Sequence, residues 1–301
     1  MKIAIVGDPH IATGFRARVD DYLRTVLRKI KEIAEANDAV IFLGDVFDTS
    51  AMPTYVFNTT YKALENYKGQ LHTILGNHDM FHRNLKSLNK TTIGSLDLTE
   101  VVKVHTEPFK VGSVEFVPVM TDDEFVKIPR DESNNKVLLC HKYYDMMVCP
   151  EESLEDSELI DLNYKYVFMG HDHQPYEPKD LGNTILYRPG SLTRTTVDDY
   201  NKERGIRYYQ IDTKDMSVTE QSVFCLPSSE VYLKGSFDKQ NKEQNRIKTD
   251  IHSLSKLLAR FDRKQLSNLS LEEVMRNRLG ATEEQVLYIR ELHRMHNIKY
   301  S

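Results

Sequence analysis

Four short polar motifs occur in order along this chain, and each follows a run of apolar, often β-branched residues. The motifs are Asp8-Pro9-His10, Gly44-Asp45-Val46-Phe47-Asp48, Gly76-Asn77-His78-Asp79 and Gly170-His171-Asp172-His173, and His141 lies alone between the last two. Such apolar runs are typical of buried strands. Because ligands bind beyond the carboxyl ends of strands in open α/β sheets, we expect these polar side chains to converge there.

The motifs combine carboxylates, an amide and imidazoles and contain no cysteine. Carboxylates with imidazoles suit Mn, Fe or Zn, whereas an all-oxygen set would indicate Mg or Ca. Two divalent cations roughly 3.5–4 Å apart need an anionic bridge, which a carboxylate can supply. The ordered set therefore predicts a two-metal hydrolytic site. The alternative is a group of ordinary core or surface histidines, and each polar group would then need its own separate hydrogen-bond partner.

In this order, the motifs resemble those of the calcineurin-like metallophosphoesterase superfamily over residues 1–224. The resemblance implies one metal held by Asp8, His10, Asp45 and His173, and a second held by the bridging Asp45 with Asn77, His141 and His171. It also implies that His78 stands beside the phosphate as general acid or charge stabiliser, with Asp48 orienting its ring. For Asp48 and Asp79, a turn or helix-capping role stays an alternative.

Two departures narrow the resemblance. The protein serine/threonine phosphatases of this superfamily place arginine after the second motif and glutamate at the end of the third, where this chain has Thr49 and Asp79. The surrounding sequence instead resembles the nuclease subunit of the double-strand-break repair complex, of the SbcD type, and its bacteriophage recombination-endonuclease relatives. The residues that carry this resemblance are Pro53, Arg83-Asn84, Tyr187-Arg188-Pro189-Gly190-Ser191, Arg194 and Arg204-Gly205.

This narrower resemblance implies a DNA nuclease, most simply Mn²⁺-dependent with Fe or Zn as alternatives. It would hydrolyse phosphodiester bonds in DNA recombination, repair or replication, together with an SbcC-like ABC-type ATPase. Family members dimerise through helices beside the second and third motifs, so a homodimer is expected. Two other functions stay open: a stand-alone phosphodiesterase or phosphatase acting on nucleotides or RNA ends, and a non-enzymatic DNA-end-binding regulatory module.

The net charge of −5 is unusual for a DNA enzyme. Sequence-independent affinity for DNA comes mainly from Lys and Arg side chains on phosphates, so the charge argues against tight binding by this chain alone. Candidate phosphate contacts are Arg83, Lys86, Arg188 and Arg194. For any one of them, an ordinary solvated surface position is the simpler interpretation.

The composition also bears on the compartment. No membrane segment is visible, and the first apolar run is interrupted by Gly7 and ends at Asp8, unlike a cleaved signal peptide. The three cysteines show no metal-ligand spacing, and an odd number cannot pair completely. We therefore expect a cytoplasmic protein, in the host cytoplasm if the source is viral.

Apolar spacing predicts an amphipathic helix at residues 19–34 and strands at 184–187, 205–211 and 218–224. Pro53, which suits a first helical turn, predicts a second helix at 53–67. The expected fold is α/β, with two packed mixed sheets flanked by helices and a short, mainly helical C-terminal appendage. We place the phosphoesterase domain at residues 1–228 and a reduced cap with a helical region at 229–301. Two capping-box patterns predict a helical hairpin at 270–298. By resemblance, it would dock on the ATPase; packing on its own catalytic domain is the alternative.

Overall fold

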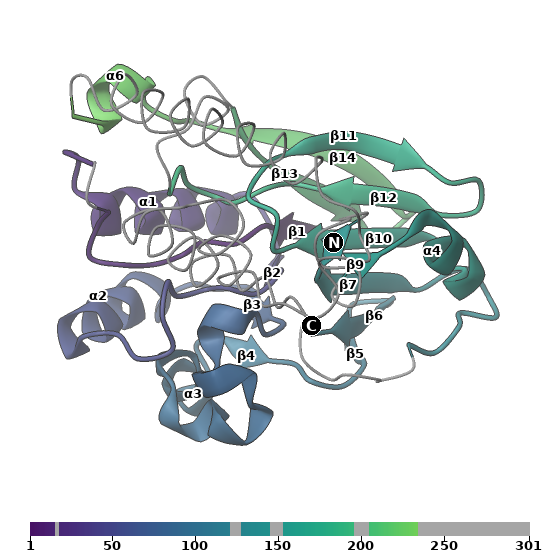
Figure 1. Cartoon of the computed structure of the whole chain (residues 1–301), viewed down its shortest axis with the longest axis horizontal. Coiled ribbons are helices and arrows are strands. Elements are labelled where there is room, and N and C mark those ends of the chain that lie inside the picture. The colour runs from purple at the N-terminus through teal and green to yellow at the C-terminus, as the bar shows by residue number, and fades with distance from the viewer. Residues whose placement is uncertain (16–17, 121–127, 145–152, 196–204, 234–301) are drawn as a thin grey trace, which may run out of the picture. The chain divides into compact units, whose positions relative to one another are not determined.

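The computed structural model describes residues 1–15, 18–120, 128–144, 153–195 and 205–233 (Figure 1). The chain divides into two units, Met1–Phe237 and Asp238–Ser301, and every described residue belongs to the first. The hairpin predicted at 270–298 lies outside the described residues. The domain boundary expected after residue 228 stays a prediction.

Two six-stranded sheets form the centre of the first unit. The first sheet has the order β14 (Ser217–Val223), β13 (Ile206–Asp212), β1 (Lys2–Val6), β2 (Ala39–Phe42), β3 (Gln70–Thr73) and β4 (Lys103–Val104). The second has the order β11 (Tyr176–Asp180), β12 (Ile185–Arg188), β10 (Tyr166–Gly170), β7 (Val137–His141), β6 (Val114–Val119) and β5 (Phe109–Val111). Two short strands, β8 (Tyr143–Tyr144) and β9 (Ser153–Leu154), pair separately. Both large sheets mix parallel and antiparallel neighbours.

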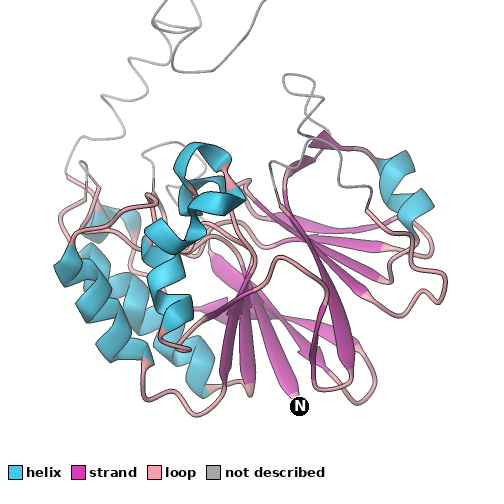
Figure 2. Cartoon of the chain, turned by 90° about the horizontal axis from the view of Figure 1, so that it is seen from below, coloured by secondary structure: helices cyan, strands magenta, loops and turns pink. Residues whose placement is uncertain are grey.

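Helices lie outside the sheets (Figure 2). The α-helices are α1 (Tyr22–Glu35), α2 (Thr54–Leu64), α3 (Thr92–Leu98), α4 (Asp156–Leu162) and α6 (Ser228–Val231). Three 3₁₀ turns connect β3 to α3: η1 (Asn77–Asp79), η2 (Phe81–Arg83) and η3 (Leu85–Lys90). The predicted α/β fold, two mixed sheets flanked by helices, is confirmed. In the described part of the chain, every helix is too short or too polar to cross a bilayer.

Three apolar layers hold these elements together, and strand alternation creates them. In β1, Ile3 and Ile5 pack between the two sheets, while Ala4 and Val6 pack toward the helices beside the first sheet. In β7, Cys140 belongs to a third layer, shared with α4 residues such as Leu159. A strand that is buried on both faces reads as a continuous apolar run, which is why these strands were visible in the sequence.

The two predicted N-terminal helices are both shorter than expected. The carboxylate of Asp21 accepts a hydrogen bond from the backbone N–H of Arg24 at 3.2 Å and caps α1. Val19 therefore precedes the helix, and 56% of its surface is exposed. The predicted start of the amphipathic helix at residue 19 was therefore wrong. Helix α2 follows Pro53, as predicted, but ends at Leu64. Proline in a first turn predicts the start of a helix well, whereas apolar periodicity predicts its end less well.

Two histidines, one buried and one partly exposed, contact each other beside β3 and β4 of the first sheet. His72 is 3% exposed, its Nδ1 lies 2.8 Å from His105 Nε2, and the His105 ring stacks on Phe109 with centroids 3.6 Å apart. Burial, together with the nearby charges of His105 and Lys103, lowers the pKa of His72 from 6.5 to about 4. Burial likewise lowers the pKa of His105 to about 4. Both rings are therefore neutral in the folded protein at neutral pH.

We expect this pair to make the fold acid-sensitive. An unfolded histidine takes up a proton near pH 6.5 but the folded one only near pH 4, so stability falls as the pH drops between those values. Between pH 6.5 and pH 4, His72 should lower the free energy of unfolding by about 3 kcal/mol. Thermal unfolding measured across this range should show a shallower pH dependence for His72→Gln than for the wild type. His82→Gln, which changes an exposed histidine, should leave the slope as it is; equal slopes for all three proteins would contradict the assignment.

Candidate metal centre

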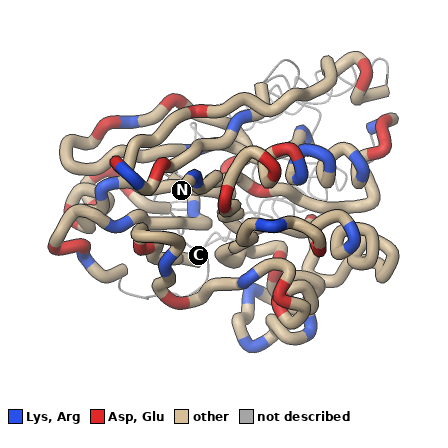
Figure 3. The backbone as a smooth tube through the Cα atoms, turned by 180° about the vertical axis from the view of Figure 1, so that it is seen from behind, with Lys and Arg blue, Asp and Glu red and all other residues tan. Residues whose placement is uncertain are grey.

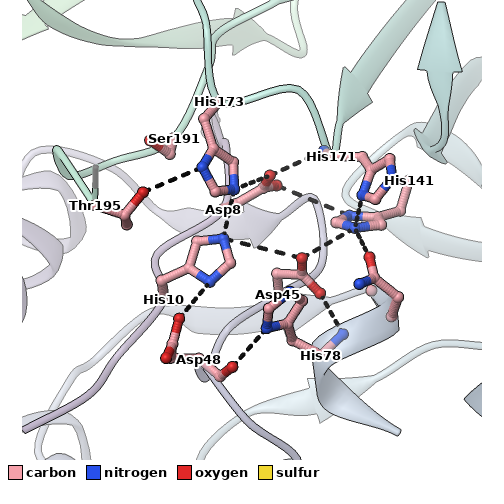
Figure 4. Close-up of polar contacts among 12 residues, drawn as sticks. Asp8, His10, Asp45, Asp48, His78, His141, His171, His173, Ser191 and Thr195 are labelled. Carbon is pink, nitrogen blue, oxygen red and sulfur yellow. Dashed lines mark hydrogen bonds and ion pairs between the residues drawn. The ribbon is translucent and has the colours of Figure 1, made fainter. Parts of the chain in front are cut away.

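All seven predicted metal-ligand residues lie together at the carboxyl ends of strands from both sheets (Figure 4). They are contributed as follows: Asp8 and His10 after β1, Asp45 after β2, Asn77 in η1 after β3, His141 at the end of β7, and His171 and His173 after β10. Because the strands that carry them are parallel and adjacent within each sheet, their ends meet at one edge.

Two of the groups that could hold a metal ion are Asp8 with His10 and His173, and Asp45 with His141 and His171. In each group, the candidate ligand atoms lie within 4.8 Å of one another. His10 Nε2 lies 2.8 Å from His173 Nε2. Asp45 Oδ2 lies 3.2 Å from His141 Nε2 and 3.9 Å from His10 Nε2. This one carboxylate oxygen therefore stands between the two groups, where a bridging ligand would be required.

Neighbouring acceptors orient the histidine rings. Nδ1 of His141 donates to the carbonyl oxygen of Leu43 at 2.7 Å, which leaves Nε2 facing Asn77 Oδ1 at 3.1 Å. On the other side of the site, Nδ1 of His173 lies 3.2 Å from the hydroxyl oxygen of Thr195. A histidine whose second nitrogen is held in this way presents a lone pair in a fixed direction, as metal-ligating histidines do.

Two buried polar atoms at this edge lack a hydrogen bond in the part of the chain that the structure describes. Asp8 Oδ1 and His171 Nε2 are buried, and neither forms a hydrogen bond within the described residues. A buried carboxylate oxygen and a buried imidazole nitrogen that form no hydrogen bond are costly unless a cation contacts them. The residues present therefore fit divalent metal ions, and the mixed oxygen and nitrogen donors match the chemistry expected for Mn, Fe or Zn.

Crowding of charges at this edge shifts the pKa values in opposite directions. Burial opposes the charged form of His141, but the carboxylates of Asp45 and Asp8 outweigh it and raise its pKa to about 10. Burial raises the pKa of the Asp8 carboxyl to about 6, against the favourable charge of His141. Burial, together with the charge of His141, lowers the pKa of His171 to about 2. Without metal, then, a proton on His141 balances the carboxylates; with metal, that proton must leave.

Asp79 braces the two loops that carry Asp45 and Asn77. Its buried carboxylate accepts hydrogen bonds from the backbone N–H of Val46 at 3.1 Å and of Gly76 at 3.0 Å. A Cβ on Gly76 would lie 2.0 Å from Asp45 Oδ1, so only glycine admits the Asp45 carboxylate at this distance. The turn role that was left open for Asp79 matches these bonds.

Three of the candidate ligand residues have left-handed backbone conformations. The φ angles are 47° at His10, 45° at Asp45 and 78° at His171. Residues other than glycine adopt such angles rarely, and when they do they often mark functional sites. The surrounding hydrogen bonds hold these angles: the N–H of His10 donates to the carbonyl of Asp45 at 3.0 Å, and the N–H of His171 donates to Asp8 Oδ2 at 2.9 Å.

The predicted pair of His78 and Asp48 is present, but the contact differs from the expected one. Nδ1 of His78 lies 2.5 Å from the backbone carbonyl oxygen of Asp48, and the Asp48 carboxylate lies 3.4 Å from Nδ1 of His10. The proposed orientation of His78 by the Asp48 carboxylate is therefore wrong, because the loop turns that side chain toward His10. The backbone N–H of His78 donates to Asp45 Oδ1 at 2.8 Å, which ties the residue to the metal centre.

The four candidate phosphate contacts occupy different environments. Arg83 is partly exposed and close enough to His171 for its charge to lower the pKa of that ring, while Lys86 is exposed. Arg188 lies with its guanidinium 3.7 Å from the ring centre of Tyr176. Arg194 is only 5% exposed and donates to the carbonyl of Leu226 at 2.8 Å. Arg194 thus holds the chain near residue 226, and its role in substrate binding stays a prediction.

Sequence reasoning missed two residues at this site. Thr195 contacts His173, but it sits outside every motif and carries no distinguishing pattern. The ring of Tyr143 lies against that of His171, with centroids 4.0 Å apart. Its position two residues beyond His141, at the end of the same apolar run, was the available signal.

This chain is similar to several known proteins. A family model described as calcineurin-like phosphoesterase matches residues 1–175. The chain is 24% identical over 289 residues to exonuclease subunit 1 of Enterobacteria phage T4, covering 87% of this chain and 80% of that protein. A solved archaeal phosphodiesterase is 17% identical, with a TM-score of 0.42, covering 74% of this chain and 99% of its own. A solved protein of Thermus thermophilus is 12% identical, with a TM-score of 0.46, covering 73% of this chain and 98% of its own. Because the family model spans more than half of the sequence, the chain belongs to the calcineurin-like phosphoesterase family.

Proposed function

We propose that this chain is the catalytic subunit of a two-metal DNA nuclease that hydrolyses phosphodiester bonds in recombination, repair or replication. The observation that carries the proposal is the position of Asp45 Oδ2 between two His and Asp groups. Hydrolytic enzymes of phosphate esters use paired metals of this kind. The choice of DNA as substrate rests on the similarity to the phage exonuclease subunit and on the sequence features that surround the motifs.

The ligand sets follow the sequence motifs. Asp8, His10, Asp45 and His173 would hold one ion, and Asp45, Asn77, His141 and His171 the other. Bound divalent ions, with Mn²⁺ the best match and Fe or Zn as alternatives, would supply an activated water and stabilise charge on the phosphate oxygens. The carbonyl of Leu43, the Asp48 carboxylate and Thr195 fix the orientation of the rings of His141, His10 and His173. These rings are therefore in place before metal arrives, and His141 has only to release its proton.

His78 is the group we assign to proton transfer or charge stabilisation. The hydrogen bond between Nδ1 and the Asp48 carbonyl places the N–H on that nitrogen and directs Nε2 away from it. The ring lies edge-to-face with His10, with centroids 5.1 Å apart, and so borders the metal centre while staying outside the two ligand sets proposed above. A histidine in this position can donate a proton to the departing oxygen or stabilise its charge.

Substrate binding would use basic residues close to the metal centre. Arg83 is the best candidate for a phosphate contact because its charge reaches His171, and Lys86 follows it in η3. Figure 3 shows Lys and Arg interspersed with Asp and Glu along the described backbone. Such a mixed surface gives little sequence-independent attraction to DNA. We therefore propose that an SbcC-like ABC ATPase supplies further DNA affinity, docked through residues 270–298, and that two copies of the chain associate.

The proposal is tested by a cleavage assay on end-labelled linear DNA and on circular DNA, with Mn²⁺, in the presence and absence of the ATPase subunit. We expect Mn²⁺-dependent cleavage that the ATPase increases. Rapid hydrolysis of p-nitrophenyl phosphate with no cleavage of long DNA would replace the nuclease with a small-substrate phosphatase or phosphodiesterase. A protein that binds no transition metal and cleaves neither substrate would be a non-enzymatic module instead.

A further inference from the structure

A tyrosine ring forms part of the wall of the metal centre. Tyr143 lies on β8, two residues beyond His141, and its ring faces that of His171 at 4.0 Å between centroids and an angle of 57°. Tyr143 is partly exposed to solvent. An aromatic face beside a proposed metal ligand is poorly suited to a phosphate but well suited to the flat, apolar surface of a base.

The neighbouring residue fixes the strand that carries this ring. The hydroxyl of Tyr144 donates to the carboxylate of Asp156, at the start of α4, and accepts from Lys179 Nζ at 2.6 Å. Lys179 also forms an ion pair with Asp156 at 2.6 Å. Successive side chains of a strand point to opposite faces, so holding Tyr144 on the α4 side directs Tyr143 toward His171.

Arg188 joins this support to the loop that carries the candidate ligands. Its guanidinium lies 4.6 Å from the ring centre of Tyr144 and 3.7 Å from that of Tyr176. The hydroxyl of Tyr176 in turn bonds the carboxylate of Asp172, which lies between His171 and His173. The guanidinium of Arg188 thus contacts both Tyr144 of β8 and Tyr176, which bonds the loop of His171 and His173. Arg188 is a positioning residue, and its planar group is engaged by aromatic rings rather than held out toward phosphate.

We propose that Tyr143 stacks on the nucleobase next to the scissile phosphate, so that the site recognises a base as well as a phosphate. This inference rests on the proposed nuclease function and adds to it a residue that contacts the base. A base paired within a duplex keeps its faces covered by its neighbours, whereas an unpaired base offers a face to an aromatic side chain.

The test compares two single-stranded substrates, a short oligothymidylate and the same oligomer with every base replaced by hydrogen. Base stacking on an aromatic residue contributes about 1–3 kcal/mol, so Tyr143→Leu should reduce kcat/KM on oligothymidylate about tenfold. It should leave kcat/KM on the abasic oligomer unchanged. Tyr143→Phe keeps the ring and should behave as the wild type on both. Phe224→Leu, which removes a ring that is 65% exposed on another part of the fold, serves as the matched control.

Equal loss on both oligomers would overturn the proposal and leave Tyr143 a purely structural residue; no loss on either would overturn it as well. A binding measurement separates this inference from the nuclease assignment. With Ca²⁺ in place of Mn²⁺, a single strand carrying 2-aminopurine should be quenched by the wild type and Tyr143→Phe but not by Tyr143→Leu. That pattern would support stacking even if DNA were never cleaved, and identical quenching by all three proteins would refute it.

Discussion

Replacing Asp45 with Asn should reduce Mn²⁺-dependent phosphodiester hydrolysis by at least about 10³-fold. Mutation of a residue that only orients a metal ligand typically costs about 10–100-fold in metal affinity or activity, and loss of a bridging ligand should cost more. Asp45 Oδ2 stands 3.2 Å from His141 and 3.9 Å from His10, so one substitution weakens both proposed metal positions. Asn keeps the volume and can still accept the hydrogen bond from the His78 N–H. Metal content by mass spectrometry and hydrolysis rates should fall together.

Asp38→Asn is the matched control for this substitution. Asp38 immediately precedes β2, whereas Asp45 follows the other end of that strand, and its carboxylate accepts from the backbone N–H of Lys2 at 2.7 Å. We expect it to change neither metal content nor hydrolysis. Circular dichroism of the metal-free proteins checks that both variants fold. An Asp45→Asn protein that keeps full metal content and full activity would show that the carboxylate does not bridge the ions.

Replacing His78 with Asn should lower kcat by about 10²–10⁴-fold, the usual contribution of a general acid or base, while the protein keeps its metal. His78 Nδ1 is held by the Asp48 carbonyl rather than turned into either proposed ligand set. A substrate with a nitrophenolate leaving group needs little protonation at the departing oxygen. If His78 acts as general acid, the variant should lose much less activity on that substrate than on DNA; equal losses would indicate charge stabilisation.

The control for His78 lies in the same connection between β3 and α3. His82 is exposed, and its φ of 51° is one that Asn tolerates. His82→Asn should therefore leave kcat and metal content unchanged. Loss of metal in folded His78→Asn would contradict the proton-transfer role, because His10, Asp48 and His78 form a third group that could hold an ion.

Much of the fold and the convergence of the site could be predicted from sequence, for a physical reason. Parallel strands that are buried on both faces, such as β2 and β7, read as continuous apolar runs. Once their positions are known, the geometry of each sheet brings the carboxyl ends of its parallel strands to one edge. The packing of the two sheets then brings Asp45 within 3.2 Å of His141. Neither step depends on how individual side chains pack.

Side-chain partners could not be predicted in the same way. The Asp48 carboxylate contacts His10 while its carbonyl contacts His78, and the sequence does not distinguish a carboxylate from the carbonyl of the same residue. Arg194 was expected to contact phosphate, and the sequence does not predict that it donates to the carbonyl of Leu226. Both outcomes depend on loop conformations that connect distant parts of the chain, where propensity and periodicity carry little information.

His10, Asp45 and His171 have left-handed backbone conformations, which lower the stability of the fold, and their side chains are needed for metal binding. Each such angle costs on the order of 1 kcal/mol in a residue that has a Cβ, and glycine would relieve that cost. Glycine, however, has no side chain with which to bind a metal. Variants selected only for a more heat-resistant metal-free protein would therefore tend to lose the reaction first at these three positions. Thermostability and hydrolysis must then be selected together in any engineered form of this fold.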